Sequence, residues 1–377
     1  MEEEVQKMTE LFNDYTFQVV ALGGIALGIL CGVTGVFAVL RKQSLIGDSI
    51  AHSSLAGIAV AFILTQSKNT EVLLLGALVV GLITTFIIDF FSNNTRINFE
   101  SAMALVMSSF FGFGLMLLTE IQKFPNANQA GLNRFLFGQA ATILLQDVVL
   151  IVVVTLLVLI LIIIFWKEIK LFIFDETFSC TSGFSCRFIN LLLNAFIVAS
   201  VIVGIQMVGV VLMSALIIAP AVAARQWSSS LLSMVLLAII IGAISGFTGT
   251  VISSSISGFP TGPAIVLIVS TFVFVSILLA PKRGIVHKHI QKKYAIKCFE
   301  AEMLLIHYFS HHDKDVKARF DKTDFYINTI DNHKITDKHF NKLLNNLSKR
   351  KLLVINDQEL TLCAAGLELL IQQGVEL

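Results

Sequence analysis

Two side chains that could bind a metal ion stand four residues apart at the start of an apolar segment. Asp48 and His52 follow the polar stretch 41–44, and the segment that they open is largely apolar as far as residue 64. A spacing of four residues places both side chains on one face of a helix, with Cβ atoms about 5–6 Å apart. A carboxylate oxygen and an imidazole nitrogen are suitable ligands for Mn, Fe or Zn ions. The spacing therefore predicts a site for a divalent transition metal.

The composition is that of a polytopic membrane protein. Hydrophobic residues make up 55% and charged residues 14% of the 377 residues, and the mean hydropathy is +0.82. These values exclude an ordinary soluble enzyme. The acidic N-terminus lacks the basic region of a cleavable signal, so the first apolar run is expected to remain as a membrane span. The five cysteines follow no zinc-ligand spacing, and we expect them to be reduced, without a disulfide.

The apolar segments predict nine membrane crossings. Five are expected at residues 17–40, 48–65, 72–90, 101–119 and 144–166. The uncharged blocks 188–224 and 226–281 are each long enough for two more, with divisions at Pro220 and at residues 258–263. The number falls to eight if residues 207–225 do not form a full span.

Asp48 and His52 have a structural interpretation beside the metal site. Asp48 could cap its helix and His52 could be a core residue. However, an ionised Asp near the centre of a bilayer costs about 2.5–3.5 kcal/mol, so ionisable residues in spans are candidates for function. The chain has eight histidines, and His52 is the only one before residue 287. These observations favour the metal site.

The distribution of basic residues predicts the orientation. If the N-terminus is outside, one side of the membrane carries Arg41, Lys42, Arg96, Lys167, Lys170, Arg187, Arg225, Lys282 and Arg283. Lys68, Lys123 and Arg134 fall on the other side, and the first set is larger and closer to the span ends. The first side is therefore expected to be cytoplasmic, together with the C-terminal region.

One polar loop, residues 167–187, separates the fifth and sixth predicted spans on the cytoplasmic side. Its first half has helical character, and taken alone it could be an ordinary connector. Asp89, Glu100 and Asp147 lie within a few residues of predicted span ends. We interpret these three as interfacial or capping residues and not as ligands for a transported ion.

The C-terminal region, residues 285–377, has the pattern of a small α+β domain. Residues 298–310 predict an amphipathic helix, and Thr336 is a predicted N-cap for a helix over 337–350. Residues 352–362 predict a β-hairpin, and a last short helix is expected after Gly366. This order is typical of a winged-helix domain. We therefore expect a membrane domain over residues 1–284 and a winged-helix-like cytoplasmic domain over residues 285–377.

A DNA-binding role for this domain is one interpretation of its basic residues. These are Lys338, Lys342, Lys349, Arg350 and Lys351, on or just after the helix that would contact DNA. Tethering to a membrane protein favours the other interpretation, a solvated helix face on an accessory domain. His311 and His312 are a weak metal-binding signal, because adjacent histidines on loops are common.

Several stretches, taken in order along the chain, resemble the permease subunits of ABC importers for manganese, zinc and iron. They are residues 35–52, 174–183, 208–225, 257–263 and 280–284. The resemblance covers residues 17–284. This sequence has Ala56 where the family usually has proline, Ser179 where it usually has alanine, and Glu100 where it usually has aspartate.

The resemblance implies a fold, a site and a set of partners. The fold would be an all-α polytopic membrane protein of the ABC importer permease type, and Asp48 and His52 would bind the transported metal. A helix that docks into an ATPase subunit would include Phe174, Asp175, Glu176, Phe178 and Gly183. The partners would be cytoplasmic ABC ATPase subunits, an extracytoplasmic metal-binding protein, and a second copy or a related permease, within a bacterial inner (plasma) membrane. No nucleic acid and no permanently bound cofactor are expected.

The chain itself is not expected to be an enzyme. It has no Gly-rich phosphate-binding loop ending in Lys-Ser or Lys-Thr, so ATP hydrolysis would belong to the partner subunits. A permease for a metal chelate, such as a siderophore or vitamin B12, is an alternative, but a wide lumen would need no charged ligand pair. A membrane metallohydrolase would need more ligands than one His provides. A membrane-tethered regulator would depend on the C-terminal region alone.

Overall fold

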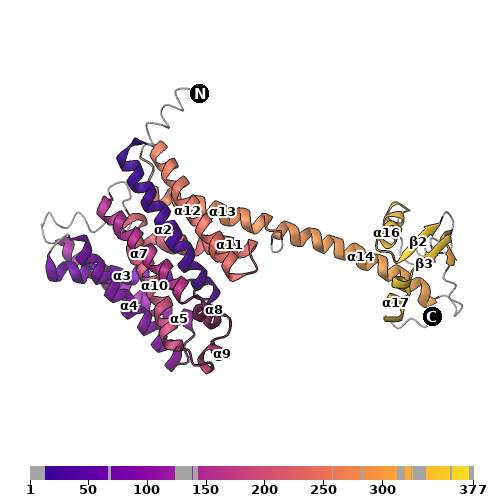
Figure 1. Ribbon diagram of the computed structural model, residues 1–377, viewed down its shortest axis with the longest axis horizontal. Helices are drawn as coiled ribbons and strands as arrows, with labels where there is room; N and C mark the ends of the chain where they lie inside the picture. The colour runs from indigo at the N-terminus through magenta and orange to yellow at the C-terminus, as the bar shows by residue number, and fades with distance from the viewer. Residues whose placement is uncertain are drawn as a thin grey trace. The chain divides into compact units, whose positions relative to one another are not determined.

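The computed structural model of the chain describes residues 13–66, 69–123, 138, 143–256, 258–281, 284–311, 319–323, 325, 337–356 and 359–372. The chain divides into two compact units, Met1–Gly284 and Ile285–Leu377, and each unit is described by itself. Figure 1 labels their helices and strands.

The first unit is entirely helical in its described part. Its helices are α2 (Tyr15–Leu40), α3 (Ile46–Thr65), α4 (Thr70–Asn94), α5 (Phe99–Lys123), α7 (Leu145–Ile164), α8 (Trp166–Phe174), α9 (Glu176–Thr181), α10 (Cys186–Val208), α11 (Val210–Trp227), α12 (Leu231–Ser255) and α13 (Thr261–Leu279). Among the residues that the structure describes, nine of these helices are long and apolar enough to cross a membrane; α8 and α9 are not among them. The prediction of an all-α polytopic membrane protein is confirmed.

The break between α10 and α11 lies at Gly209, so the predicted division at Pro220 was wrong. Gly209 has φ 89° and ψ 161°, a conformation that glycine adopts far more readily than other residues, and it ends α10. Pro220 lies inside α11. A membrane helix tolerates a proline because neighbouring groups satisfy the freed carbonyl. The backbone at Gly209, in contrast, leaves the helical region altogether.

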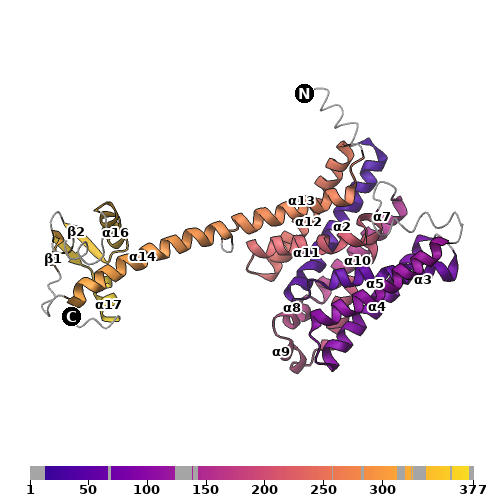
Figure 2. The same cartoon turned by 180° about the vertical axis from the view of Figure 1, so that it is seen from behind.

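Helix α2 is the most deeply buried span. Its residues are buried along most of their length, and it packs against α12 with glycine facing glycine. A Cβ atom on Gly28 would lie only 2.1 Å from the carbonyl oxygen of Gly242, so the two backbones are in direct contact. Figures 1 and 2 both show α2 alongside α12. Small residues of this kind allow the close helix packing that stabilises membrane bundles.

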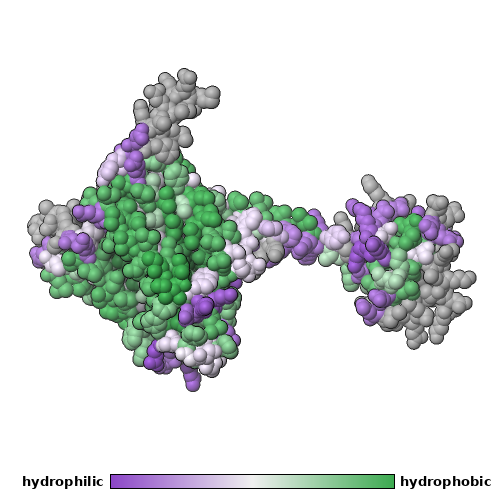
Figure 3. Space-filling model, in the orientation of Figure 1, coloured by the Kyte–Doolittle hydropathy of each residue, from purple (hydrophilic) through white to green (hydrophobic). Residues whose placement is uncertain are grey.

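The outer surface of the first unit is apolar. Phe86, Ile163 and Phe274, on α4, α7 and α13, are among its many exposed large apolar side chains. Figure 3 shows that such residues cover most of the visible face of this unit. A continuous apolar surface of this size is unfavourable in water, and it is suited to contact with lipid.

The second unit is a small α+β structure. Its described elements are α14 (Ile285–His311), β1 (Arg319–Asp321), α16 (Asp337–Lys349), β2 (Leu353–Asn356), β3 (Glu359–Leu362) and α17 (Ala364–Gln372). The three strands form an antiparallel sheet in the order β1-β3-β2. Leu305, Phe340, Leu344 and Leu360 lie in its buried core, and Arg350 forms an ion pair with Glu302 at 2.5 Å.

The hairpin and the helix before it lie where the sequence predicted them, but other details differ. Helix α14 begins at Ile285, well before the predicted residue 298, and β1 was not predicted. Gly366 lies inside α17 and not before it. A Cβ atom there would lie 2.4 Å from the carbonyl oxygen of Leu352, so only glycine allows α17 to lie this close to Leu352. The predicted cap Thr336 and the side chains of His311 and His312 lie outside the described residues.

Candidate metal centre and docking segment

A short connection brings Asp48 into the first turn of α3. Helix α2 ends at Leu40, Lys42 takes a left-handed conformation with φ 58°, and α3 begins at Ile46. The N-cap residue of α3, Leu45, makes no side-chain capping bond. The carboxylate of Asp48 instead faces His52, one turn later, and Ser214. A negative charge in the first turn is also favoured by the helix dipole.

Asp48 and His52 lie together with a spacing that fits a shared metal ion. Nε2 of His52 lies 3.4 Å from Oδ1 of Asp48, and the two side chains are 20% and 30% exposed. Two ligand atoms that are each about 2.1 Å from a tetrahedrally coordinated ion lie about 3.4 Å apart. The pair therefore needs little rearrangement to bind one ion.

The surroundings of His52 leave one ring nitrogen without a partner. Nδ1 is buried and has no hydrogen-bond partner among the described residues. On another side, the ring packs edge-on against Phe111 of α5, with ring centroids 4.8 Å apart and an interplanar angle of 80°. A buried polar atom without a partner destabilises a fold by roughly 1–3 kcal/mol. The position of the His52 ring therefore has a cost in stability, which is typical of a residue kept for function.

Ser214 belongs to the same cluster and was not identified from the sequence. Its side chain, on α11, lies close enough to the carboxylate of Asp48 for a hydrogen bond. The first turn of α3 packs against α11, since a Cβ atom on Gly47 would lie 3.2 Å from the side chain of Ile217. A serine in an apolar span is uncharged and belongs to no recognisable motif. Only the packing of α11 on α3 shows that Ser214 lies beside Asp48.

One chain offers an incomplete set of ligands. Within the described ranges, no group of three or more His, Cys, Asp or Glu residues could hold a metal ion. Asp48 and His52 provide two strong donors, and the Ser214 hydroxyl is a weaker one. A tetrahedral metal site usually requires four ligands. The cluster therefore has the chemistry of part of a metal site.

The segment α8–α9 presents two aromatic side chains at the surface. Phe174 is 65% and Phe178 55% exposed, while Phe172 of α8 is buried. Asp175 caps α9, because the N–H of Phe178 donates to Oδ1 of Asp175 at 2.8 Å. Exposed aromatic residues beside charged ones are suited to binding a protein partner.

The remaining docking residues shape the end of α9. Glu176 begins the helix, and Gly183 turns the chain with φ 91°, which favours glycine. Ser179 is fully buried, and its hydroxyl has no hydrogen-bond partner in the described part of the chain. Alanine, which resembling permeases usually have at this position, would avoid that cost.

The expectation of reduced cysteines was wrong at the end of α9. Cys180 and Cys186 form a disulfide, with Cα atoms 5.5 Å apart. The turn at Gly183 brings the two residues within the range that a disulfide requires. Cys31 and Cys363 are free.

A second polar cluster joins Asp89 to Arg41, two residues that the sequence analysis did not connect. Nδ2 of Asn190 and Nδ2 of Asn194 each donate to Oδ2 of Asp89 at 3.0 Å. Arg41 donates from Nη1 to Oδ1 of Asn194 at 2.9 Å and from Nη2 to Oδ1 of Asn190. Asp89 is therefore more than an interfacial residue. Asp147, in contrast, caps α7 as expected, accepting from the N–H of Leu144 at 3.1 Å.

The nine apolar helices in the described part of the chain are those of a multi-pass membrane protein. The sequence model of the ABC 3 transport family matches residues 13–280. The chain belongs to this family, as the resemblance in the sequence had indicated. It is a transport permease and not an enzyme.

Relatives and a solved structure agree with this assignment. The chain is 48% identical over 281 residues to the zinc transport system membrane protein TroC of Treponema pallidum, covering 74% of this chain and 94% of TroC. It is 41% identical over 298 residues to the manganese transport system membrane protein MntC of Bacillus subtilis, covering 79% and 68%. The solved structure of PsaBC from Streptococcus pneumoniae in complex with Fab matches with a TM-score of 0.66 and 29% identity, covering 77% of this chain and 99% of that one.

Proposed function

We propose that this permease imports a divalent transition metal ion, Mn, Zn or Fe, and that Asp48 and His52 bind the ion in its pathway. The observation that carries the proposal is the 3.4 Å approach of Nε2 to Oδ1 on one face of α3. The buried Nδ1 of His52 supports it, because a ligand could use or reorient that ring. The names of the relatives, zinc and manganese transport proteins, support the class of substrate.

A second permease subunit completes the site in this proposal. Two strong donors per chain are too few for a metal ion, but a two-fold axis would bring two Asp48 and two His52 together. The partner is a second copy or a related permease with the same pair. The metal is cargo, and the permease binds no permanent cofactor.

ATP hydrolysis by cytoplasmic ABC ATPase subunits drives the transport, and an extracytoplasmic metal-binding protein delivers the ion. Phe174 and Phe178 bind the ATPase through their exposed rings, while Asp175, Glu176 and Gly183 fix the geometry of α9. The basic residues Arg41, Arg187 and Arg225 support a cytoplasmic location for this face, beneath the inner membrane of a bacterium.

The second unit is a cytoplasmic accessory domain of the winged-helix type. The strand order β1-β3-β2 and the position of α16 before the hairpin support this assignment. Arg350, one of the five basic residues on or after α16, is paired with Glu302 inside the unit. This pairing reduces the positive charge available for phosphate, and it supports a role in assembly or regulation without nucleic acid.

Metal uptake into proteoliposomes tests the proposal. The permease would be reconstituted with its ATPase and its metal-binding protein, and uptake of Mn, Zn and Fe would be measured singly and in competition. The wild type is expected to import at least one of the three free ions, and Asp48→Asn is expected to abolish that import. The control is Asp147→Asn, which removes a carboxylate that caps α7 at another span end. Import of a metal chelate with no import of free ions would contradict the proposal.

A further inference from the structure

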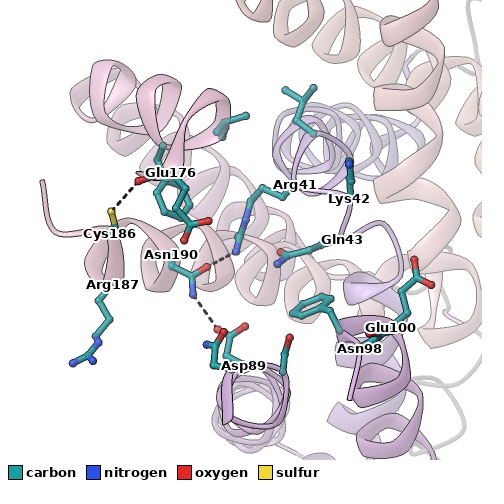
Figure 4. Close-up of a pocket in the computed structure, with 16 residues that line it drawn as sticks. Arg41, Lys42, Gln43, Asp89, Asn98, Glu100, Glu176, Cys186, Arg187 and Asn190 are labelled. Atoms are coloured by element: carbon teal, nitrogen blue, oxygen red, sulfur yellow. Dashed lines mark hydrogen bonds between the residues drawn. The ribbon is translucent and has the colours of Figure 1, made fainter. Parts of the chain in front are cut away.

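A polar cavity lies where the docking segment meets the spans. Its volume is about 890 Å³, and its lining includes Arg41, Lys42, Asp89, Glu176 and Asn190. These residues come from the end of α2 and the connection to α3, from α4, from α9 and from α10. Figure 4 shows Arg41 pointing at Asn190, and Asn190 in turn pointing at Asp89. No part of the metal centre lines this cavity, so it is a separate feature of the unit.

Arg41 is the central residue of the cluster. Burial lowers its pKa to about 10, against the opposing effects of the charges of Asp89 and Glu176. The guanidinium therefore remains a cation at neutral pH. Its Cζ lies 5.9 Å from the ring centroid of Phe172 in α8, within the range of a cation–π interaction. One side chain thus contacts the docking segment on one side and α10 on the other.

Two asparagines connect Arg41 to Asp89 with a fixed polarity. Each amide oxygen accepts from the guanidinium, and each amide nitrogen donates to the carboxylate. Asn190 and Asn194 stand one turn apart on α10, so both present their amides to the same two groups. A planar guanidinium can donate to two acceptors at once, whereas a lysine ammonium is a point charge.

The connection between Arg41 and the metal centre is short and internally bonded. Only residues 41–45 separate α2 from α3. Within them, the N–H of Gln43 donates to the carbonyl oxygen of Ala38 at 2.9 Å, and that of Ile46 donates to Gln43 at 3.1 Å. Asp48 follows within the first turn of α3. A displacement of Arg41 would therefore shift the start of the helix that carries Asp48.

We propose that Arg41 is a positioning residue that couples the docking segment to the metal centre, acting through Asn190 and Asn194 on Asp89. A movement of α8 and α9, driven by the ATPase, shifts the guanidinium relative to α10 and α4. The connection to α3 then carries this shift to Asp48 and His52, and the cavity provides the space. This inference rests on the proposed function, because it requires an ATPase at the docking segment and a metal at the centre.

The test is the number of ATP molecules hydrolysed per metal ion imported, measured in proteoliposomes with the complete transporter. Arg41→Lys keeps the charge but cannot hold both amides in the same planar geometry. Uptake should fall by about 5–150-fold, the usual range of coupling between two sites. ATP hydrolysis, and metal binding without nucleotide, should each stay within about twofold of the wild type. Lys42→Gln, an exposed residue that lines the same cavity, is the matched control and should leave the ratio unchanged.

A charge exchange keeps the test decisive if Arg41→Lys fails to assemble. Asp89→Asn should raise the ratio, because the network loses its carboxylate. Adding Asn194→Asp restores one carboxylate that accepts from Arg41 and from the new amide at position 89, so the double variant should recover coupling. A wild-type ratio in Arg41→Lys, or an equal loss in Lys42→Gln, would overturn the inference while leaving metal import intact. Wild-type transporter that imports none of the three ions would overturn the proposed function and the inference with it.

Discussion

The first unit contains two polar clusters, and they differ in how completely their groups are paired. Around Arg41, the two amide oxygens and two amide nitrogens of Asn190 and Asn194 all have partners within the cluster. Around Asp48, the Nδ1 of His52 has no partner among the described residues. Asp48 and His52 could provide two metal ligands, which is fewer than a complete site requires.

This difference separates a cluster that fixes helices from one that is prepared for a ligand. Buried polar groups are normally paired, and a fully paired network holds its elements in one arrangement. Asp48 and His52, in contrast, are joined by one 3.4 Å contact, which a bound ion could replace. The two clusters should therefore respond differently to substitution and to metal.

The largest effect is expected from the metal pair. Asp48→Asn or His52→Gln should lower metal affinity by more than about 100-fold, since losing a direct ligand should exceed the effect of losing an outer-shell partner. Direct binding to the purified transporter, measured by calorimetry, would give the affinity. Melting temperature without metal should change little in either variant. Retention of wild-type affinity by both would remove the distinction between the clusters.

Removing an exposed aromatic ring of the docking segment should come next. Phe174→Ala should weaken binding of the ATPase by about 30-fold, because a central aromatic contact contributes about 2 kcal/mol or more to an interface. Surface plasmon resonance with the separate ATPase measures this directly. Metal affinity should stay at its wild-type value. Leu191→Ala, at another exposed apolar position on α10, serves as the control.

Ser214→Ala should have a smaller effect on the metal pair. Losing the hydroxyl that orients the Asp48 carboxylate should weaken metal binding by about 10-fold. Ser214→Thr retains a hydroxyl and should bind almost normally. Equal affinities for the alanine and threonine variants would show that the hydrogen bond to Asp48 does not position the ligand.

The smallest effect on metal affinity is expected from the paired cluster. Asn194→Leu leaves Asp89 and Arg41 each with one partner fewer and should destabilise the protein by about 1–3 kcal/mol. Thermal unfolding in detergent, with and without metal, is the measurement. Metal should stabilise this variant as much as the wild type, and it should not stabilise His52→Gln. Loss of metal protection in Asn194→Leu would place both clusters in one site.

The proximity of Asp48 and His52, the proposed metal pair, could be predicted from the sequence because its geometry is local. A spacing of four residues becomes adjacency in any helix, and ionisable residues are rare in spans. The nine spans were predictable for a similar reason, since the length and apolarity of a span are set by the bilayer. The break between α10 and α11 was misplaced because proline is the stronger sequence signal, although the φ angle of Gly209 makes the actual break.

The Arg41 cluster could not be predicted in this way. Asn190 and Asn194, which accept hydrogen bonds from Arg41, lie 149 and 153 residues after it in the sequence. Both are uncharged, and neither composition nor spacing distinguishes them from other asparagines. Arg41 and Asp89 each had an adequate local explanation as residues near span ends. Only the packing of α10 between them shows that they belong together. Cys180 and Cys186 were missed for a related reason, because a turn at Gly183 and not a spacing rule brings them into contact.

The glycine contact between α2 and α12 has a consequence for how the chain is made. Helix α2 is synthesised first and α12 about 200 residues later, which at 5–20 residues per second leaves α2 without this partner for roughly 10–40 s. During that interval the face of α2 around Gly28 is exposed to lipid or to other newly made helices. Once α12 packs against it, this face has no room for a Cβ atom. A chain that ends before residue 231 would lack α12, so the glycine face of α2 would stay without the partner that it fits.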